Sequence, residues 1–141
     1  MIVLDTNVVS EPMRPEADSA VKNWLDRQVA ETLYLTATSL AELLLGIELL
    51  PKGRRKEGLD AALAGLVERL FGSRILPFDK PAAVEYARLV GRARVAGRTI
   101  SVGDGQIAAI ASVHGFAVAT RDSEPFAAVG VSVIDPWQAK L

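Results

Sequence analysis

Short apolar runs that alternate with longer amphipathic segments constrain this chain more than any other feature. Residues 1–4, 32–37, 74–78, 116–120 and 131–134 are too short for core helices and are predicted to be buried strands. The segments between them carry the three-and-four apolar spacing of helices. Strands separated by helices favour a parallel sheet covered on both faces. We therefore expect an α/β fold of three layers, α/β/α, around a central parallel sheet of about five strands.

Capping and breaking residues predict where the helices begin and end. The first helix is expected after residues 15–18, and the next over residues 40–50, capped by Thr38 or Ser39. A charged connection at 53–56 leads to a helix at about 59–71, and others are expected over about 79–95 and 103–113. Pro77 predicts an edge position or a strand end for residues 74–78. With no repeat or linker, residues 1–141 are expected to form a single domain.

Composition removes several classes of chemistry. The chain has no cysteine, which excludes disulfides, thiolate catalysis and cysteine-bound zinc. Its one histidine, His114, is better explained as a cation at a helix C-terminus before Gly115 than as a catalytic base. Any bound metal should therefore have oxygen ligands.

Nothing in the sequence predicts export or a membrane span. Residues 1–5 lead directly into an apolar strand, without a basic region or a long apolar region. Apolar runs such as 43–45 are far shorter than the roughly 20 residues that cross a bilayer. We expect a cytoplasmic protein with no membrane partner.

Four acidic side chains stand where a parallel sheet binds ligands. Asp5 directly follows the first strand, and Asp122 follows the strand at 116–120 after one intervening residue. Glu42 and Asp104 lie in the first turns of two predicted helices. Ligands of open α/β sheets bind beyond the carboxyl ends of the strands. The four acids are therefore candidates for one pocket.

Each acid also has a structural explanation, which the residues alone leave open. Asp5 and Asp122 could simply form turn or capping hydrogen bonds. Glu42 and Asp104 each stand three residues after a serine, as in a capping box. Only their joint placement distinguishes a pocket from four separate caps.

The arrangement as a whole resembles the PIN-domain family. Ile2 to Ser10 (IVLDTNVVS) is similar to that family's first motif, and Thr38 to Ile47 (TSLAELLLGI) to its second. Ile100 to Phe126 (ISVGDGQIAAIASVHGFAVATRDSEPF) is similar to the third and fourth. The resemblance covers nearly the whole chain. Chain length and residues 131–137 (VSVIDPW) are most similar to VapC-like and FitB-like toxins of bacterial type II toxin-antitoxin pairs.

One position departs from the family pattern. Many relatives have Asn-x-x-Asp-Phe where this chain has residues 122–126 (DSEPF), so Pro125 stands in place of an acid. The fourth acid is therefore placed at Asp122, and Glu124 is a possible auxiliary.

The resemblance implies a Mg²⁺- or Mn²⁺-dependent endoribonuclease that cleaves single-stranded RNA by metal-activated water, leaving a 5′-phosphate and a 3′-hydroxyl. Hard divalent cations prefer carboxylate oxygens, and a bound cation lowers the pKa of water. Asp5 and Asp104 are predicted as principal ligands. Glu42 and Asp122 would complete the set, directly or through water.

Two polar neighbours are predicted auxiliaries of this site. Asn7 and Thr120 could orient an acid or a water, although capping or turn hydrogen bonds explain both equally well.

The resemblance also implies three partners: RNA, a second copy in a homodimer, and a small antitoxin whose tail blocks the acidic pocket. Two basic clusters could guide RNA despite a net charge of −1. The first is Lys52, Arg54, Arg55 and Lys56, and the second is Arg88, Arg92, Arg94 and Arg98. Runs of charge are, however, more often simply solvated surface. Trp24 and Trp137 are expected to pack rather than to stack on bases.

Three alternative functions follow from the same residues. A haloacid-dehalogenase-type phosphatase would need a second aspartate two residues after Asp5, where this chain has Asn7. A phospho-receiver domain would need an acidic pair and a late lysine, and neither is found where expected. A catalytically silent PIN-like module that binds RNA or protein is the third alternative, and the presence of all four acids disfavours it.

Overall fold

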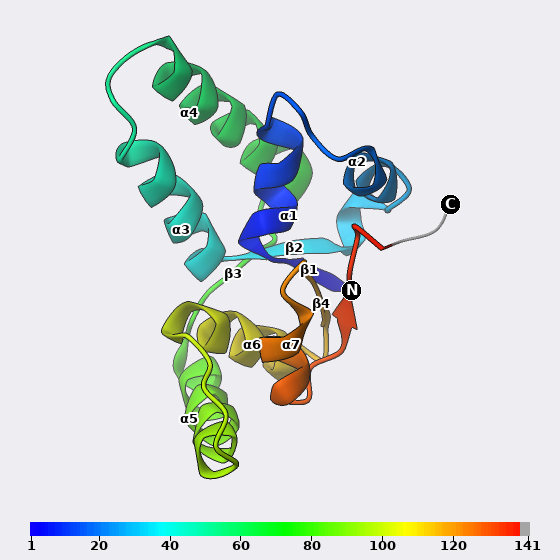
Figure 1. Cartoon of the computed structure of the whole chain (residues 1–141), viewed down its shortest axis with the longest axis vertical. Coiled ribbons are helices and arrows are strands. Elements are labelled where there is room, and N and C mark those ends of the chain that lie inside the picture. The colour runs from blue at the N-terminus through cyan, green and yellow to red at the C-terminus, as the bar shows by residue number, and fades with distance from the viewer. Residues whose placement is uncertain (139–141) are drawn as a thin grey trace.

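Five short strands form one parallel sheet in the computed structural model, which describes residues 1–138 (Figure 1). They are β1 (Ile2–Leu4), β2 (Leu33–Thr36), β3 (Ile75–Leu76), β4 (Ala117–Ala119) and β5 (Val133–Ile134). Their order is β3-β2-β1-β4-β5, and every pairing is parallel. The predicted α/β fold is confirmed. The edge position that Pro77 predicts for the third strand is confirmed as well.

Helices cover both faces of the sheet and so form the predicted three layers (Figure 1). One face carries α1 (Thr6–Ser10), α2 (Ser19–Asp26), α3 (Ala37–Glu48) and α4 (Arg54–Leu66), with the short turns η1 (Glu11–Met13), η2 (Ala30–Thr32) and η3 (Val67–Phe71). The other carries α6 (Val102–His114) and α7 (Ser123–Ala128), with α5 (Lys80–Val95) packed on α6. Within residues 1–138, no helix is long and apolar enough to cross a membrane.

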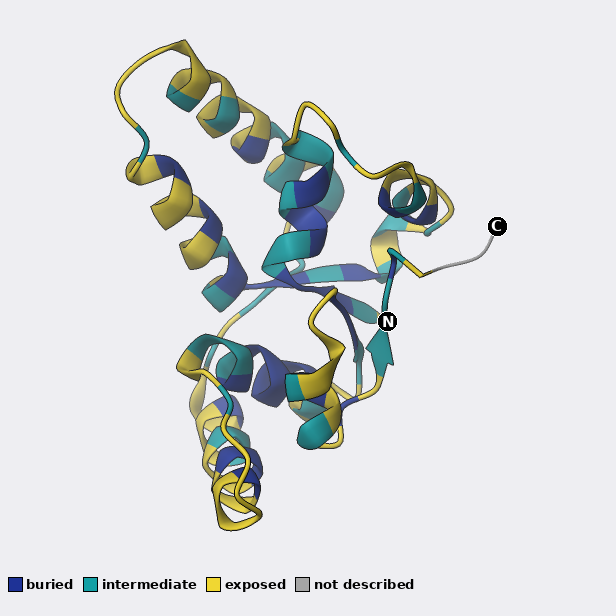
Figure 2. Cartoon of the chain, viewed as in Figure 1, coloured by how far each residue is buried: buried dark blue, intermediate teal, exposed yellow. Residues whose placement is uncertain are grey.

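The strands are largely buried between the helices (Figure 2). Their alternate side chains enter two apolar cores, one on each face of the sheet. Leu4 packs with the core beneath α1 to α4, which also buries Trp24 as expected. Val3 and Val118 pack with the core beneath α6 and α7. Successive strand residues point to opposite faces, and both faces are covered. For that reason the strands are continuous apolar runs rather than alternating ones.

The helices differ from the sequence prediction at the starts of α3 and α4 and in the presence of α1 and α7. The Oγ1 atom of Thr36 accepts the Ser39 amide at 3.0 Å, so Thr36 caps α3 and the predicted cap by Thr38 or Ser39 is wrong. The charged residues 54–56 of the predicted connection form the start of α4, and the N-cap residue Gly53 has a φ of 154°. The helices α1 and α7 were not predicted, because five and six residues are too few to show an apolar period.

Close packing between α5 and α6 depends on a glycine next to Asp104. A Cβ atom at Gly105 would lie 2.7 Å from Cε2 of Tyr86 and 3.0 Å from Cγ2 of Val90, both on α5. Real side chains essentially never approach so closely, so only glycine fits without movement. This contact positions the helix that carries Asp104.

We expect Gly105→Ala to lower the free energy of unfolding by about 1 to 3 kcal/mol, because overpacking outweighs the roughly 1 kcal/mol that alanine adds through helix propensity. Gly91→Ala in α5 is the matched control, since its Cβ would meet nothing within 4 Å. That control should be neutral or stabilising. Urea denaturation compares the two, and equal stabilities would contradict the close α5–α6 packing.

Candidate active site

The fold brings the four predicted acids to the carboxyl end of the central strands, although they are far apart in sequence. Asp5 follows β1 and Asp122 follows β4, and these two strands are neighbours. The strand order reverses between them, since β2 and β3 lie on one side and β5 on the other. Such a switch point is the usual ligand site of an open parallel sheet. Glu42 and Asp104 reach it from α3 and from the first turn of α6.

Each of the four carboxylates interacts electrostatically with at least one of the others. Burial raises the pKa of Asp5, and the charges of Asp104 and Asp122 raise it further. The pKa of Glu42 is raised by burial and by the charges of Asp5 and Asp104. Burial and the Asp122 charge raise the pKa of Asp104. Gathering these groups without a counterion therefore disfavours their charged forms.

Asp5 is the most enclosed of the four acids, with 5% of its surface exposed. Its Oδ1 atom accepts the Thr6 amide at 2.8 Å, and its Oδ2 atom accepts the Thr120 hydroxyl at 2.7 Å. Asp5 is also the N-cap of α1, so the capping explanation is correct for one of its oxygens. The two hydrogen bonds fix the orientation of the carboxylate.

Thr120 and Asn7 connect Asp5 to Asp122. The buried Thr120 hydroxyl donates to Asp5 and accepts the Asp122 amide at 3.0 Å. The Nδ2 atom of Asn7 donates to Oγ1 of Thr120 and to Oδ2 of Asp122, both at 3.4 Å. Asp122 itself makes no side-chain capping bond to α7. The two predicted auxiliary residues thus join the acids that follow β1 and β4.

Glu42 does not form the capping box that its spacing suggests. Thr36 caps α3, so Ser39 is already inside the helix. The Oε1 atom of Glu42 instead lies 3.1 Å from the position that a Cβ would occupy on Gly103. Because Gly103 has no side chain, the Glu42 carboxylate can approach the N-terminus of α6, next to Asp104.

Asp104 combines a helix-start position with a place among the acids. The Oγ atom of Ser101 accepts the Asp104 amide at 3.1 Å and caps α6, as the capping explanation predicts. A second contact ties α6 to α3, because the Thr38 hydroxyl donates to Oε1 of Gln106 at 2.9 Å. The two helices, one from each face of the sheet, therefore hold Glu42 and Asp104 at the same end of the strands.

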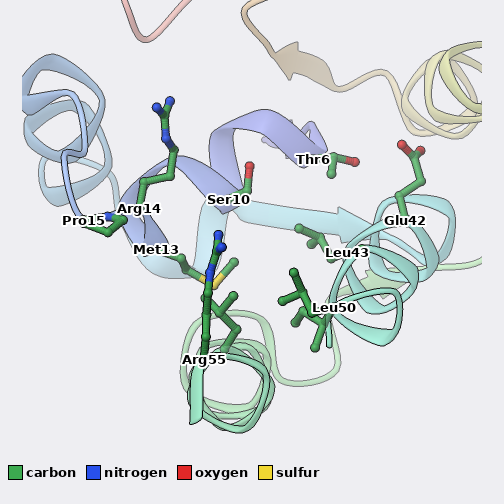
Figure 3. A pocket seen from close by; sticks show the side chains of 12 residues that line it. Thr6, Ser10, Met13, Arg14, Pro15, Glu42, Leu43, Leu50 and Arg55 are labelled. Carbon is green, nitrogen blue, oxygen red and sulfur yellow. The ribbon is translucent and has the colours of Figure 1, made fainter. Parts of the chain in front are cut away.

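The chemistry of this donor set fits a hard divalent cation. Carboxylate and hydroxyl oxygens are the ligands that Mg²⁺ and Mn²⁺ prefer. The Thr6 hydroxyl is buried, makes no well-formed hydrogen bond within residues 1–138, and lies at the same end of a groove as Glu42, whose pKa it lowers (Figure 3). Within residues 1–138, no three acidic or histidine side chains are already arranged around one ion. For all four acids to contact one cation, the exposed side chains of Glu42 and Asp122 would have to turn inward.

Two other residues singled out in the sequence lie apart from the acids. His114 ends α6, as predicted, and its ring stacks on Phe116 with centroids 5.4 Å apart. Arg88, from the second basic cluster, donates two hydrogen bonds of 2.6 and 2.7 Å to Glu85. Arg88 and Ser112 lower the pKa of Glu85 to about 2. Arg88 is therefore already neutralised by an ion pair.

A groove beside Glu42 has no signal in the sequence. It measures about 560 Å³ and lies between α1 and η1 on one side and α3 and α4 on the other (Figure 3). Its floor is apolar, and the side chains there are Met13, Leu43, Ile47, Leu50 and Leu59. Thr6 and Glu42 stand at one end, whereas Arg14 and Arg55 lie further along (Figure 3). The sequence could not indicate this groove, because α1, which forms one wall, is too short to predict.

Comparison with known proteins identifies close relatives. A family model described as the PIN domain matches residues 2–131. The VapC ribonuclease Y4jK of Sinorhizobium fredii is 48% identical over 138 residues, covering 98% of this chain and 99% of the relative. The toxin FitB of Neisseria gonorrhoeae is 47% identical over 97% of this chain and 99% of its own length. The solved structure of FitAcB from Neisseria gonorrhoeae superposes with a TM-score of 0.94 at 46% identity, over 99% of this chain and 100% of that one. These matches exclude the phosphatase and receiver alternatives.

Asp104→Asn tests the cost of gathering the acids without a cation. Burial and Asp122 raise the pKa of Asp104 above the value of 3.8 for an ordinary aspartate. The folded protein binds the Asp104 proton more tightly than the unfolded chain does. The stability that this proton contributes is complete below pH 3.8 and is lost as the pH rises through the raised pKa. In EDTA at neutral pH, we expect Asp104→Asn to melt at the same temperature as the unsubstituted protein or higher.

The control for this measurement is a genuine capping aspartate. Asp18 caps α2 through the Ala20 amide at 2.8 Å, so Asp18→Ala should cost about 1 kcal/mol. If Asp104→Asn loses as much stability as Asp18→Ala, Asp104 acts as a structural cap and the repulsion argument is wrong.

Proposed function

This chain belongs to the PIN-domain family, and we propose that it is a Mg²⁺- or Mn²⁺-dependent endoribonuclease, the toxin of a toxin-antitoxin pair. The observation that carries the proposal is the group of four mutually repelling carboxylates at the switch point of the sheet. The relative named a VapC ribonuclease, 48% identical over nearly the full chain, supports the reaction type. Residues 1–141 act in this proposal as a single cytoplasmic domain.

Asp5 and Asp104 are the proposed principal ligands of the cation. Asp5 has a fixed orientation, since Thr6 and Thr120 each hold one of its oxygens. Asp104 is fixed by the capped first turn of α6. Glu42 and Asp122 are exposed and complete the set by changing rotamer.

The proposed reaction is hydrolysis of single-stranded RNA that leaves a 5′-phosphate and a 3′-hydroxyl. A bound Mg²⁺ or Mn²⁺ supplies Lewis acidity and a water of lowered pKa. Thr120 holds the Asp5 carboxylate and the Asp122 amide, and Asn7 holds the Arg121 amide, so that Asp122 needs only a change of side-chain rotamer to reach the cation. No side chain has to act as a nucleophile, which agrees with the absence of cysteine and the remote position of His114.

A small antitoxin is the proposed protein partner, and the groove beside Glu42 is its proposed binding site. FitB, whose solved complex is FitAcB, supports a partner of this kind. The apolar floor suits the nonpolar face of a peptide segment, whereas Arg14 and Arg55 suit an acidic residue. A basic residue of the same segment would complement the four acids and block the pocket.

A homodimer is the second proposed assembly. The outer surface of α3 exposes Leu44 and Leu45, at 46% and 58% of their area, and the C-cap residue Leu49 is 76% exposed. Exposed apolar clusters of this kind commonly mark protein contacts. The symmetric contact that we propose would place α3 of each copy at the interface.

Loss of a principal ligand should abolish cleavage. We expect Asp5→Asn and Asp104→Asn to cleave RNA at least about 100-fold more slowly than the unsubstituted protein in Mg²⁺ or Mn²⁺, since even residues that only support a ligand contribute 10- to 100-fold. The measurement is expression of each protein in cells, followed by mapping of new 5′-phosphate ends. Asp60→Asn, an exposed acid of α4, is the control and should remain active.

Two outcomes would contradict the proposed activity. New 5′ ends that persist with Asp5→Asn would mean that the acids do not support the reaction. Purified protein that binds RNA but never cleaves it with Mn²⁺ would favour the catalytically silent module instead.

Obstruction of the groove should weaken the antitoxin complex. Gly46 lines the groove from α3, and an added Cβ there meets nothing within 4 Å. We expect Gly46→Glu to raise the dissociation constant for the small protein encoded beside this chain by about tenfold or more. Gly91→Glu adds the same charge to α5, on the other side of the sheet, and should bind normally. Calorimetry measures both, and equal affinities would exclude the groove as the contact.

A further inference from the structure

We propose that Arg121, supported by Trp137, binds a backbone phosphate of the RNA strand at the mouth of the acidic site. This assignment rests on the proposed ribonuclease function and adds a substrate-binding residue to it. Neither residue belongs to the four acids or to their auxiliaries. Arg121 also lies outside both basic clusters that the sequence indicates.

Arg121 stands at the acids but is not neutralised by them. With Asp104 and Asp122 it lines a hollow of about 390 Å³, which Ser123, Glu124 and Pro125 complete. Its side chain is exposed, and no Asp or Glu within residues 1–138 forms an ion pair with it. Its amide donates to Oδ1 of Asn7 at 3.3 Å, which fixes the backbone from which the side chain projects. Its positive charge therefore remains available to a ligand.

Trp137 holds the guanidinium group in place. The guanidinium carbon of Arg121 lies 5.2 Å from the centroid of the Trp137 ring, within the range of cation–π contacts. Trp137 packs against the core beneath α1 to α4, and its amide donates to Oδ1 of Asp135 at 2.9 Å. A neutral, fixed ring restricts the arginine without cancelling its charge. This is a different use of Trp137 from the simple packing role expected from the sequence.

The charge of the site explains why such a residue is useful. An RNA strand is a polyanion, and four carboxylates repel it as it approaches. A fixed cation beside Asp104 and Asp122 offsets that repulsion where the strand enters. Arginine suits this role because its planar fork can donate two hydrogen bonds to one phosphate. Arg88 shows the contrast, since Glu85 already occupies its donors.

Steady-state kinetics of the Mg²⁺- or Mn²⁺-loaded protein test the proposal, with a single-stranded RNA oligonucleotide that contains a mapped cleavage site. We expect Arg121→Ala to raise KM about tenfold and to change kcat by less than about twofold, because a contact made equally in ground and transition states affects binding alone. The slope of log KM against log salt concentration should fall by about 0.7, the value for one lost phosphate contact on a single strand. Arg121→Lys should recover part of the affinity, since it keeps the charge and loses the planar fork.

The tryptophan variants separate support of Arg121 from packing. Trp137→Phe keeps an aromatic face and should retain KM, whereas Trp137→Leu should raise it by about threefold at a similar melting temperature. Arg69→Ala is the control for net charge. Arg69 lies on η3, and η3 contacts η2, the segment that leads into the start of β2. Arg69 is therefore at the opposite end of the strands from the acids. It should leave KM unchanged.

Failure of the inference and failure of the proposed function give different results. If the unsubstituted protein cleaves RNA and Arg121→Ala keeps its KM and salt dependence, the phosphate contact is wrong and the ribonuclease function stands. A fall in kcat with unchanged KM would likewise overturn the binding role. If the unsubstituted protein cleaves no RNA, the proposed function fails and this inference fails with it.

Discussion

Parallel pairing of β1 with β4 is the constraint on which the site depends. The pairing continues one residue beyond β1, where the Asp5 amide donates to the Ala119 carbonyl at 2.9 Å. That hydrogen bond sets Asp5 beside Thr120, which in turn holds the Asp5 carboxylate and the Asp122 amide. Without this register, two acids more than a hundred residues apart would have no reason to meet. The helices then add Glu42 and Asp104 from the flanks.

Bringing the four acids together lowers the stability of the fold at this site. Burial and mutual repulsion raise the pKa of three of the acids, so their charged forms are less stable here than in water. Two apolar cores, one on each face of the sheet, hold the backbone in place against that repulsion. The arrangement is therefore suited to a cation that relieves the repulsion, and to a basic residue of a partner that imitates the cation.

Much of this structure could be predicted from the sequence, because the strands are short, continuous apolar runs and the long helices have a clear apolar period. The four acids could be named because two stand just beyond predicted strands and two stand in the first turns of predicted helices. Their order also resembles the PIN-domain motifs. The caps were harder: Thr36 and Ser39 are both good N-cap residues, and only the hydrogen bond at 3.0 Å decides between them. The groove and the contact of Arg121 with Trp137 could not be predicted, because each joins segments that only the folded chain brings together.

We propose that the four carboxylates at the switch point form one cation site. Anomalous diffraction from crystals grown with Mn²⁺ tests it most directly. We predict a manganese peak at bonding distance from the carboxylates of Asp5 and Asp104, with Glu42 or Asp122 turned toward it. A fully loaded crystal with no peak at these residues, or with manganese bound only elsewhere on the protein, would contradict the account.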